Sequence, residues 1–493
     1  MELKDIKNLN QRIYQLDTDI IRNNKVIFVA SLIFAIKLNT EFQNVGKLSQ
    51  LINFTDENVR PIDQLIKIAK DGIDTLDILD KTKQAIFNSL QTISGVNTKL
   101  DSDRRAFQQF LSDFISKDFV SIKPSDLFLE TLYMEIDKKS GNSDEGIVLT
   151  PVFAAQLMVD LANIDYKKDV VADLCSGTGL FSLLSYSKML NDMNNDLKNH
   201  SITNDEYSEY QKKLYNSIIA NDADPKMVTL CLANFLLKSL NNSLISNEDV
   251  LNLEKSSFKY KENGQEKRIQ PTKAILNPPY EDSYKPLEIV EKNISLISGN
   301  CQKGTKVVVI IPPQKFGQKK DVFARILNLA TLESVIKMQD DLFKDSGKSQ
   351  PASIFVFNVD KPHSKTDKVK YYNFTDTGYV YLKDSGLVDK NNTYSLKKEA
   401  LLNKINSQED NKGNSFVRTW TNFYEVNKEL EVTTQIDPSK IKTSKEEADI
   451  TLENITIKKM LDEKNKLISS VENNFKDEDG SFENYIIKIL SED

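Results

Sequence analysis

The sequence predicts an α/β protein in which a parallel sheet with helices on both faces lies between two helical regions. Apolar residues recur at helical spacing up to about residue 138. From about 139 to 400, short β-rich runs alternate with helical stretches, and a glycine-rich turn directly follows the first of these runs. We therefore expect a helical N-terminal domain at 1–138, an α/β domain at 139–400 and a helical C-terminal tail at 401–493.

The N-terminal part has helical periodicity and little Gly or Pro, most clearly at 20–38, 63–90 and 104–119. Its longest apolar run, Val26 to Ile36, is shorter than the ~20 residues that a bilayer span needs, so we expect a buried helix there. The first residues, MELKDIKNLNQ, lack the basic and apolar order of a signal peptide. We expect a cytoplasmic protein without a membrane segment.

The central part contains six β-rich runs separated by helical stretches, which is typical of parallel strands joined by helical crossovers. Two stretches rich in Asn, Lys and Asp, 191–206 and 385–415, are expected to be loops or insertions. The six expected strands are VVADL (170–174), SIIAND (217–222), KAIL (273–276), KVVVIIP (306–312), LESVIKM (332–338) and SIFVFNV (353–359).

The C-terminal part is again helical in pattern and rich in Lys and Glu. It ends in ITLENITIKKMLDEKNKLISSVENNF (450–475), which we expect to be a helix. This helix either packs on its own domain or binds a partner chain, and the sequence leaves both open. The residues that could form its apolar stripe are Ile455, Ile457, Met460, Leu461 and Leu467.

The composition excludes several classes of function. Two histidines and three widely spaced cysteines make a histidine-based hydrolase or a metal site unexpected, and no metal ligand is assigned. Cysteines without disulfide-like spacing fit a reducing cytosol. The phosphate-loop pattern G-x-x-x-x-G-K-[ST] is not found in the sequence, which excludes a helicase motor in this chain. The net charge is −7, whereas a protein that binds nucleic acid alone usually has a basic surface. If this chain binds nucleic acid, a partner is therefore expected to supply part of the contacts.

The first candidate site element is the turn DLCSGTG (173–179), between an apolar strand and a helix. Glycines at the carboxyl end of a first strand let the backbone approach a nucleoside cofactor, and the following helix offers N–H groups. Glycines also occur in ordinary strand-to-helix turns, so this turn alone does not identify a cofactor site. The candidate binding residues here are Asp173, Ser176, Gly177, Thr178 and Gly179.

The second candidate element is NDADP (221–225), which ends the next expected strand. An acidic side chain at this place can accept hydrogen bonds from both hydroxyls of a ribose. Asp222 is the better placed for that role, although a plain helix cap is an equal alternative for it. Asp224 is expected to cap the helix that begins at Pro225.

The third candidate element is Asn277-Pro278-Pro279-Tyr280, which closes the strand KAIL. The Asn277 side-chain oxygen and the Pro278 carbonyl can each accept one N–H of an exocyclic amino group, and Tyr280 can stack on the ring that carries it. Accepting both hydrogens directs the nitrogen lone pair towards a methyl donor without a covalent enzyme intermediate. These four residues are the catalytic candidates.

The order of these three motifs resembles that of amino-group methyltransferases, in which Asn-Pro-Pro-Tyr goes mostly with adenine N6. The segment GIVLTP (146–151) resembles the Thr-Pro motif that precedes the cofactor turn in modification subunits of type I restriction–modification systems. The segments KVVVIIPPQKFG (306–317) and 332–358, together with the helical first domain, resemble the same subgroup. One departure is Leu174 and Ser176, where the family has Pro and Cys.

The resemblance implies a Rossmann-like class I methyltransferase domain that uses S-adenosyl-L-methionine and methylates a flipped adenine in double-stranded DNA. It places Thr150 at the methionine end of the cofactor, although Thr-Pro is also an ordinary helix start. It identifies Asp249 as the acceptor for the adenine amino group of the cofactor. It further implies a separate specificity subunit and a restriction or helicase subunit as partners.

Three alternatives remain open at the level of sequence. Asn-Pro-Pro-Tyr is also found in methyltransferases that act on RNA or on protein glutamine. The chain could instead be a catalytically silent scaffold subunit, or act alone without a specificity subunit. The basic residues between Lys255 and Lys273 fit either phosphate contacts or a solvated loop.

Overall fold

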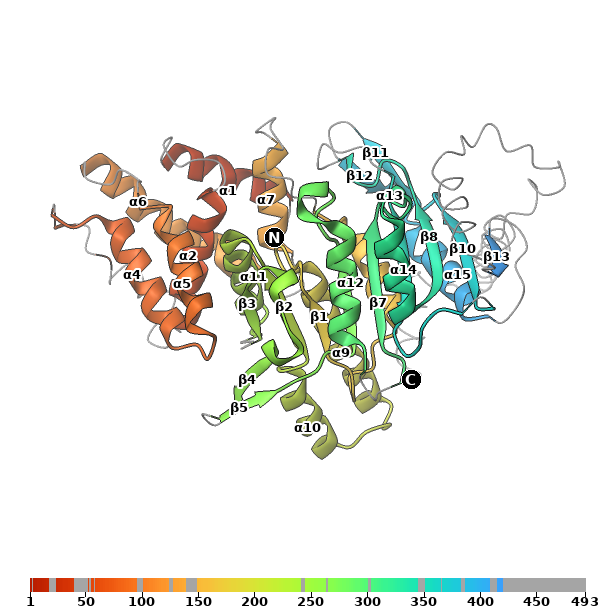
Figure 1. Ribbon diagram of the computed structural model, residues 1–493. Helices are drawn as coiled ribbons and strands as arrows, with labels where there is room; N and C mark the ends of the chain where they lie inside the picture. The colour runs from red at the N-terminus through yellow and green to blue at the C-terminus, as the bar shows by residue number, and fades with distance from the viewer. Residues whose placement is uncertain are drawn as a thin grey trace, which may run out of the picture.

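The computed structural model describes residues 1, 3–16, 24–39, 52, 55–56, 58–94, 101–123, 127–138, 149–240, 244–262, 265–299, 303–344, 351–364, 366–382, 386–407 and 415–419. Within these ranges, a helical N-terminal region packs against one edge of a nine-stranded sheet (Figure 1). The expected tail helix at 450–475 lies outside the described residues.

The N-terminal region is helical, as predicted. Helix α2 is buried on every side from Lys25 to Ile36, which confirms the buried helix expected from its unbroken apolar run. It packs against α4 and against α11 of the α/β domain, and α5 contacts both α11 and β3. An ion pair between Lys81 and Glu248 joins α5 to the loop after β3. The helices are α1 (Leu3–Leu16), α2 (Asn24–Leu38), α4 (Pro61–Asp74), α5 (Asp80–Gln91), α6 (Asp101–Asp113), the π-helix η2 (Phe114–Phe119) and α7 (Phe128–Lys138).

The sheet contains all six strands expected from the sequence. Its order is β13-β10-β8-β9-β7-β6-β1-β2-β3, and the pairs among β3, β2, β1, β6 and β7 are parallel. Strand β9 runs antiparallel to both neighbours, so the sheet is mostly rather than wholly parallel. The strands are β1 (Val171–Asp173), β2 (Ile218–Asp222), β3 (Ile245–Asn247), β6 (Lys273–Leu276), β7 (Lys306–Ile311), β8 (Thr331–Met338), β9 (Ser353–Asn358), β10 (Lys368–Phe374) and β13 (Ser415–Thr419).

Helices connect the strands in two directions from β1. The chain moves through α9 to β2 on one side, and from β6 through α12 to β7 on the other. Because parallel crossovers are right-handed, opposite directions place the two sets of helices on opposite faces. Figure 1 shows α12 and α14 in front of the sheet. The remaining helices are α8 (Val152–Leu161), α9 (Leu180–Lys198), α10 (Asn204–Leu214), α11 (Pro225–Leu237), α12 (Pro286–Ile297), α13 (Gln314–Gln318), α14 (Lys320–Leu329) and α15 (Tyr394–Asn406), with the 3-10 turns η3 (Val250–Asn252), η4 (Lys255–Ser257) and η5 (Asp282–Tyr284).

Two stretches expected to be loops are largely regular structure, so that prediction was wrong. Helix α9 continues to Lys198 and α10 begins at Asn204. The stretch 385–415 contains β12 (Gly386–Asp389), which pairs with β11 (Tyr379–Leu382), and the 13-residue helix α15. The domain boundary expected at residue 400 therefore falls within α15, and β13 extends the sheet beyond it.

The basic stretch before β6 forms a hairpin of β4 (Lys259–Glu262) and β5 (Gln265–Arg268). Its chain continues to the amino end of β6, opposite the edge at which β1 and β2 end. Lys273 is buried there and pairs with Asp169 at 3.6 Å, which removes it from the candidates for phosphate contact. None of the helices among the described residues is long and apolar enough to cross a bilayer.

Candidate active site

The strand order brings the three predicted site elements to one edge. Strand β1 pairs in parallel with β2 on one side and β6 on the other, with Ala172 opposite both Ile219 and Ala274. The carboxyl ends of all three strands therefore meet where the direction of the strand order changes, the usual place of a ligand crevice in an open α/β sheet. The glycine turn, the Asp222 strand end and the 277–280 loop follow these three ends.

The glycine turn has left-handed backbone at both of its glycines. Gly177 has a φ of +51° and Gly179 a φ of +88°, values that side-chain-bearing residues rarely adopt. The N–H of Gly179 donates to the Ser176 carbonyl at 2.7 Å, and the N–H of Ser176 donates to the Asn221 carbonyl at 2.9 Å. A side chain at Gly177 would point into open space, whereas one at Gly179 would meet Cys231 Sγ at 2.7 Å. The missing side chain at Gly177 therefore leaves the cavity open, and the missing side chain at Gly179 allows α11 to pack closely beneath the turn.

Asp222 and Asp173, two of the three acidic residues predicted to bind the cofactor, have different surroundings. Asp222 lines the cavity, and its carboxylate accepts the N–H of Gly177 at 2.8 Å and the N–H of Asp224 at 2.9 Å. Burial raises the pKa of Asp222 to about 6, although these two hydrogen bonds favour its ionised form. An ionised carboxylate has about four acceptor positions, so Asp222 retains capacity for a ligand.

Asp173 is fully buried and is not part of the cavity wall. One of its oxygens accepts from the N–H and the hydroxyl of Ser182, both at 3.3 Å. Burial raises the pKa of Asp173 to about 8. In this arrangement Asp173 fastens the turn to the first turn of α9 rather than facing a ligand. The expected helix cap is present at Asp224, whose side chain accepts the N–H of Lys226 at 2.9 Å.

Asn221 is an organising residue that sequence reasoning missed. It is buried, and its side-chain nitrogen donates to the carbonyls of Leu174 at 3.2 Å and Glu248 at 3.0 Å. Its side-chain oxygen accepts the Ser246 hydroxyl at 2.8 Å. Asn221 thus ties the ends of β1, β2 and β3 together. A polar amide inside the apolar run SIIAND was the only signal of it in the sequence.

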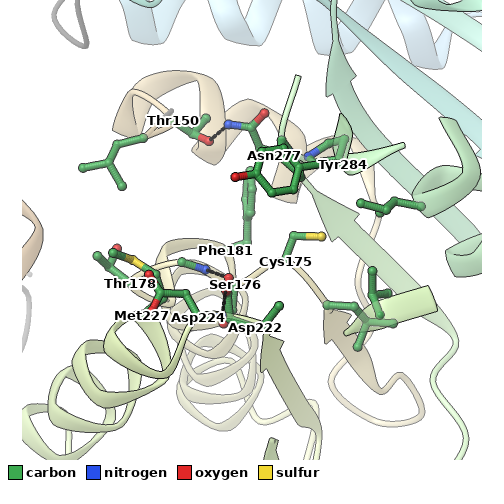
Figure 2. A pocket seen from close by; sticks show the side chains of 18 of the residues that line it. Thr150, Cys175, Ser176, Thr178, Phe181, Asp222, Asp224, Met227, Asn277 and Tyr284 are labelled. Carbon is green, nitrogen blue, oxygen red and sulfur yellow. Dashed lines mark hydrogen bonds between the residues drawn. The ribbon is translucent and has the colours of Figure 1, made fainter. Parts of the chain in front are cut away.

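The 277–280 loop faces the glycine turn across the cavity. Asn277 donates a hydrogen bond from its side-chain nitrogen to Thr150 Oγ1 at 3.0 Å, which turns the amide oxygen to the other side of the group. Figure 2 shows Thr150, Asn277 and Tyr284 at one side of the cavity and Ser176 and Asp222 at the other. Thr150 is not a helix cap, because α8 has Pro151 at that position. Its hydroxyl instead orients Asn277.

Tyr280 lies in the core rather than at the cavity wall. Its ring is 5% exposed and stands edge-on to Phe343 with centroids 5.7 Å apart, and its hydroxyl donates to the Ile310 carbonyl at 3.4 Å. In this arrangement it does not offer a face for stacking, which corrects the expected geometry. The aromatic side chain at the wall is Tyr284, which is half exposed. The sequence signal for it was the second tyrosine in NPPYEDSY (277–284).

One cavity of about 850 Å³ joins these elements. Among its walls is Asp249, which caps η3 by accepting the N–H of Leu251 at 2.9 Å. Asp173, Gly179 and Tyr280 are the predicted residues that do not reach the wall. The predicted residues that do are Thr150, Ser176, Gly177, Thr178, Asp222, Asp249, Asn277, Pro278 and Pro279.

The polar groups of this cavity fit a nucleoside cofactor with an attached chain. Carboxylates at the ends of β2 and β3 match a ribose diol and an aromatic amino group, and the open side of Gly177 allows a close approach to backbone. A second group has room at the Asn277 side of the same cavity. Both reactants of a group transfer can therefore lie in one cavity.

Comparisons with known proteins agree with this arrangement. A curated relative, the type II restriction enzyme and methyltransferase RM.BcgI of Heyndrickxia coagulans, is 29% identical over 338 residues, which cover 66% of this chain and 49% of the relative. The chain thus spans about half the length of that relative.

Solved structures share the fold at low sequence identity. A chain from a type I R-M system, studied for its complex assembly and conformational transition, is 14% identical, with a TM-score of 0.58 over 97% of this chain and 98% of that one. The type I restriction–modification methyltransferase subunit of Streptococcus thermophilus is 12% identical, with a TM-score of 0.52 over 88% of this chain and 99% of that one. The predicted fold class is confirmed.

The family comparison covers most of the chain. The model of N-6 DNA methylases matches residues 129–444, which is more than half of the sequence and includes the predicted cavity-wall residues named above. The chain belongs to the N-6 DNA methylase family.

Proposed function

We propose that the protein transfers a methyl group from S-adenosyl-L-methionine to the exocyclic amino group of an adenine in double-stranded DNA, as the modification subunit of a restriction–modification complex. The observation that carries this proposal is the shared cavity between the glycine turn at 176–178 and the Asn-Pro-Pro loop at 277–279. Membership of the N-6 DNA methylase family supports DNA as the substrate and a nitrogen as the acceptor.

The cofactor would be held at the β2 and β3 side of the cavity. Asp222 would accept the ribose hydroxyls, and Asp249 the amino group of the cofactor's adenine. The cofactor supplies an electrophilic methyl group on a sulfonium. Gly177 would let the backbone approach the cofactor closely, because open space lies where a side chain would stand.

The target amino group would be held at the other side. The Asn277 oxygen and the Pro278 carbonyl would each accept one of its hydrogens, which localises the nitrogen lone pair. Thr150 fixes the Asn277 amide in the orientation that offers the oxygen, since the amide nitrogen is engaged by the threonine hydroxyl. Preorganised acceptors of this kind lower the barrier by positioning and charge stabilisation rather than by covalent chemistry.

An adenine within a duplex must leave the stack to reach this cavity, at a cost of roughly a few kcal/mol. The chain's net charge of −7 offers little general attraction for phosphate. We therefore propose that a separate specificity subunit reads the sequence and holds the duplex, and that a restriction or helicase subunit joins the complex. The resemblance to type I systems supports this arrangement, and so does the shared fold with chains of two type I restriction–modification systems.

The experiment is methylome sequencing of cells with and without the gene, so that every natural partner is present. We expect N6-methyladenine at one sequence motif in the first cells and its loss in the second. Labelled methyl transfer to ribosomes or release factors from the deleted cells is measured in parallel. An unchanged methylome, or label appearing in RNA or protein instead, would contradict the proposal.

A further inference from the structure

A buried carboxylate from the N-terminal region reaches the cavity. Glu130 lies in the first turn of α7, is 3% exposed and forms part of the cavity wall with Thr150 and Gly177. Its neighbours Phe128 and Leu129 are fully packed in the core. The Glu130 carboxylate therefore has apolar side chains around it except on the side of the cavity.

Glu130 differs from other buried acidic residues of the chain. Asp169 pairs with Lys273, and Asp118 pairs with Arg12. No hydrogen bond or ion pair to Glu130 is formed by any of the described residues, and burial alone raises its pKa to about 8. An acidic residue in a first helical turn gains from the helix dipole, but that gain is available at an exposed position and does not account for burial at a cavity. A bound cation would account for it.

The chemistry of the cavity narrows the choice of cation. Asp222 and Asp249 lie at the ends of β2 and β3, where the adenosine part of the cofactor is proposed to bind. Glu130 comes from a different element, α7, and so meets a different part of the ligand. The methionine part carries an ammonium group, which combines a permanent positive charge with N–H donors and forms strong hydrogen bonds to a carboxylate.

We propose that Glu130 binds the α-ammonium group of the methionine part of the cofactor. This inference rests on the proposed function, because it takes the cofactor from there. The consequence is that the N-terminal helical region completes the cofactor site: α7 packs against α1, α2 and α11, so the packing of the helical region positions a ligand-binding side chain.

The test compares two ligands and two proteins in a cycle. The ligands are S-adenosylhomocysteine and its analogue without the α-amino group, and the proteins are the full chain and its isosteric variant Glu130→Gln. The wild-type chain should bind the amino-bearing ligand about tenfold or more tightly than the analogue, the range expected for a charge-assisted hydrogen bond. In Glu130→Gln that preference should fall to about twofold or less, with binding of the analogue unchanged.

Glu135→Gln is the matched control. Glu135 is also a buried carboxylate of α7, but it is not part of the cavity wall, so its variant should keep the preference of the wild type. An equal preference in the wild type and in Glu130→Gln would overturn the inference. A wild type that binds both ligands equally would also overturn it, and this result does not depend on whether a variant folds. If the wild type binds neither ligand, the proposed cofactor itself is wrong. 5′-Methylthioadenosine, which lacks the amino acid part, separates the two failures. It will not bind if the proposed cofactor is wrong, and it will bind if only the role of Glu130 is wrong.

Discussion

Gly177 and Gly179 of the glycine turn should respond differently when each is replaced by alanine. In Gly179→Ala, the new Cβ would lie 2.7 Å from Cys231 Sγ and 3.3 Å from a ring carbon of Phe235, both fully buried. Left-handed backbone costs an alanine about 1–2 kcal/mol, and overpacking adds about 1–3 kcal/mol. In Gly177→Ala only the first cost applies, because nothing lies within 4 Å of the new Cβ. We therefore expect losses of about 2–5 and about 1–2 kcal/mol, respectively.

The measurement is urea unfolding of the full chain followed by circular dichroism, with binding of S-adenosylhomocysteine measured by calorimetry on the folded variants. Gly177→Ala should be the more stable variant and yet lose affinity, since its methyl group lies at the cavity wall. Adding Cys231→Ala removes the atom that Gly179→Ala meets, so the double variant should be destabilised by less than the sum of the single changes. Equal destabilisation at both glycines, or strict additivity with Cys231→Ala, would refute the packing argument.

Further predictions concern Asp222, Thr150 and Tyr280. Asp222→Asn should weaken binding of S-adenosylhomocysteine about tenfold, because the amide offers one acceptor oxygen where the carboxylate offers two; calorimetry that finds unchanged affinity would contradict the ribose role. The pKa of Asp222, raised by burial to about 6, predicts that wild-type affinity falls as the pH is lowered below 6 and that Asp222→Asn lacks this part of the dependence. The pKa of Asp222 in the folded protein also lies above its unfolded value of 3.8, so the folded state binds more protons than the unfolded state between about pH 4 and 6. This contribution to the free energy of unfolding is therefore lost as the pH rises through that window, which urea unfolding at several pH values can check. Thr150→Val should slow methyl transfer while Thr150→Ser restores it, because serine keeps the acceptor for Asn277; equal rates in both variants would remove the orienting role. Tyr280→Phe should cost only about 1 kcal/mol of unfolding free energy and leave transfer intact, because its hydroxyl contacts the Ile310 carbonyl and not the cavity.

The central sheet could be predicted because its strands are buried on both faces. The run VVVII (307–311) is apolar and β-branched throughout, a pattern typical of a strand that is buried on both faces. The missed strands are short or lie near an edge: β3 has three residues, and β4 and β5 are mostly charged. Helix α15 escaped prediction because it lies in a stretch rich in Lys and Asn, the composition of a surface loop, although one of these lysines, Lys397, is buried in the structure.

The meeting of the site loops could also be predicted, because the carboxyl ends of neighbouring parallel strands share one edge. The direction of each side chain could not. Asp173 and Tyr280 belong to the expected motifs but point into the core, where Ser182 and Phe343 contact them. Glu130 has no local signal, since a first-turn glutamate is common on exposed helices. Its burial arises only from the packing of two regions distant in sequence.

The most direct test of the account measures cofactor binding and methyl transfer on the same preparation of Asn277→Ala. The account predicts that S-adenosylhomocysteine binds as tightly as to the wild type, because Asp222, the proposed ribose ligand, lies across the cavity from Asn277. Methyl transfer to unmethylated DNA, assayed with the partner subunits present, should fall about a hundredfold or more. Transfer at the wild-type rate would contradict the assignment of residues 277–279 to the target amino group.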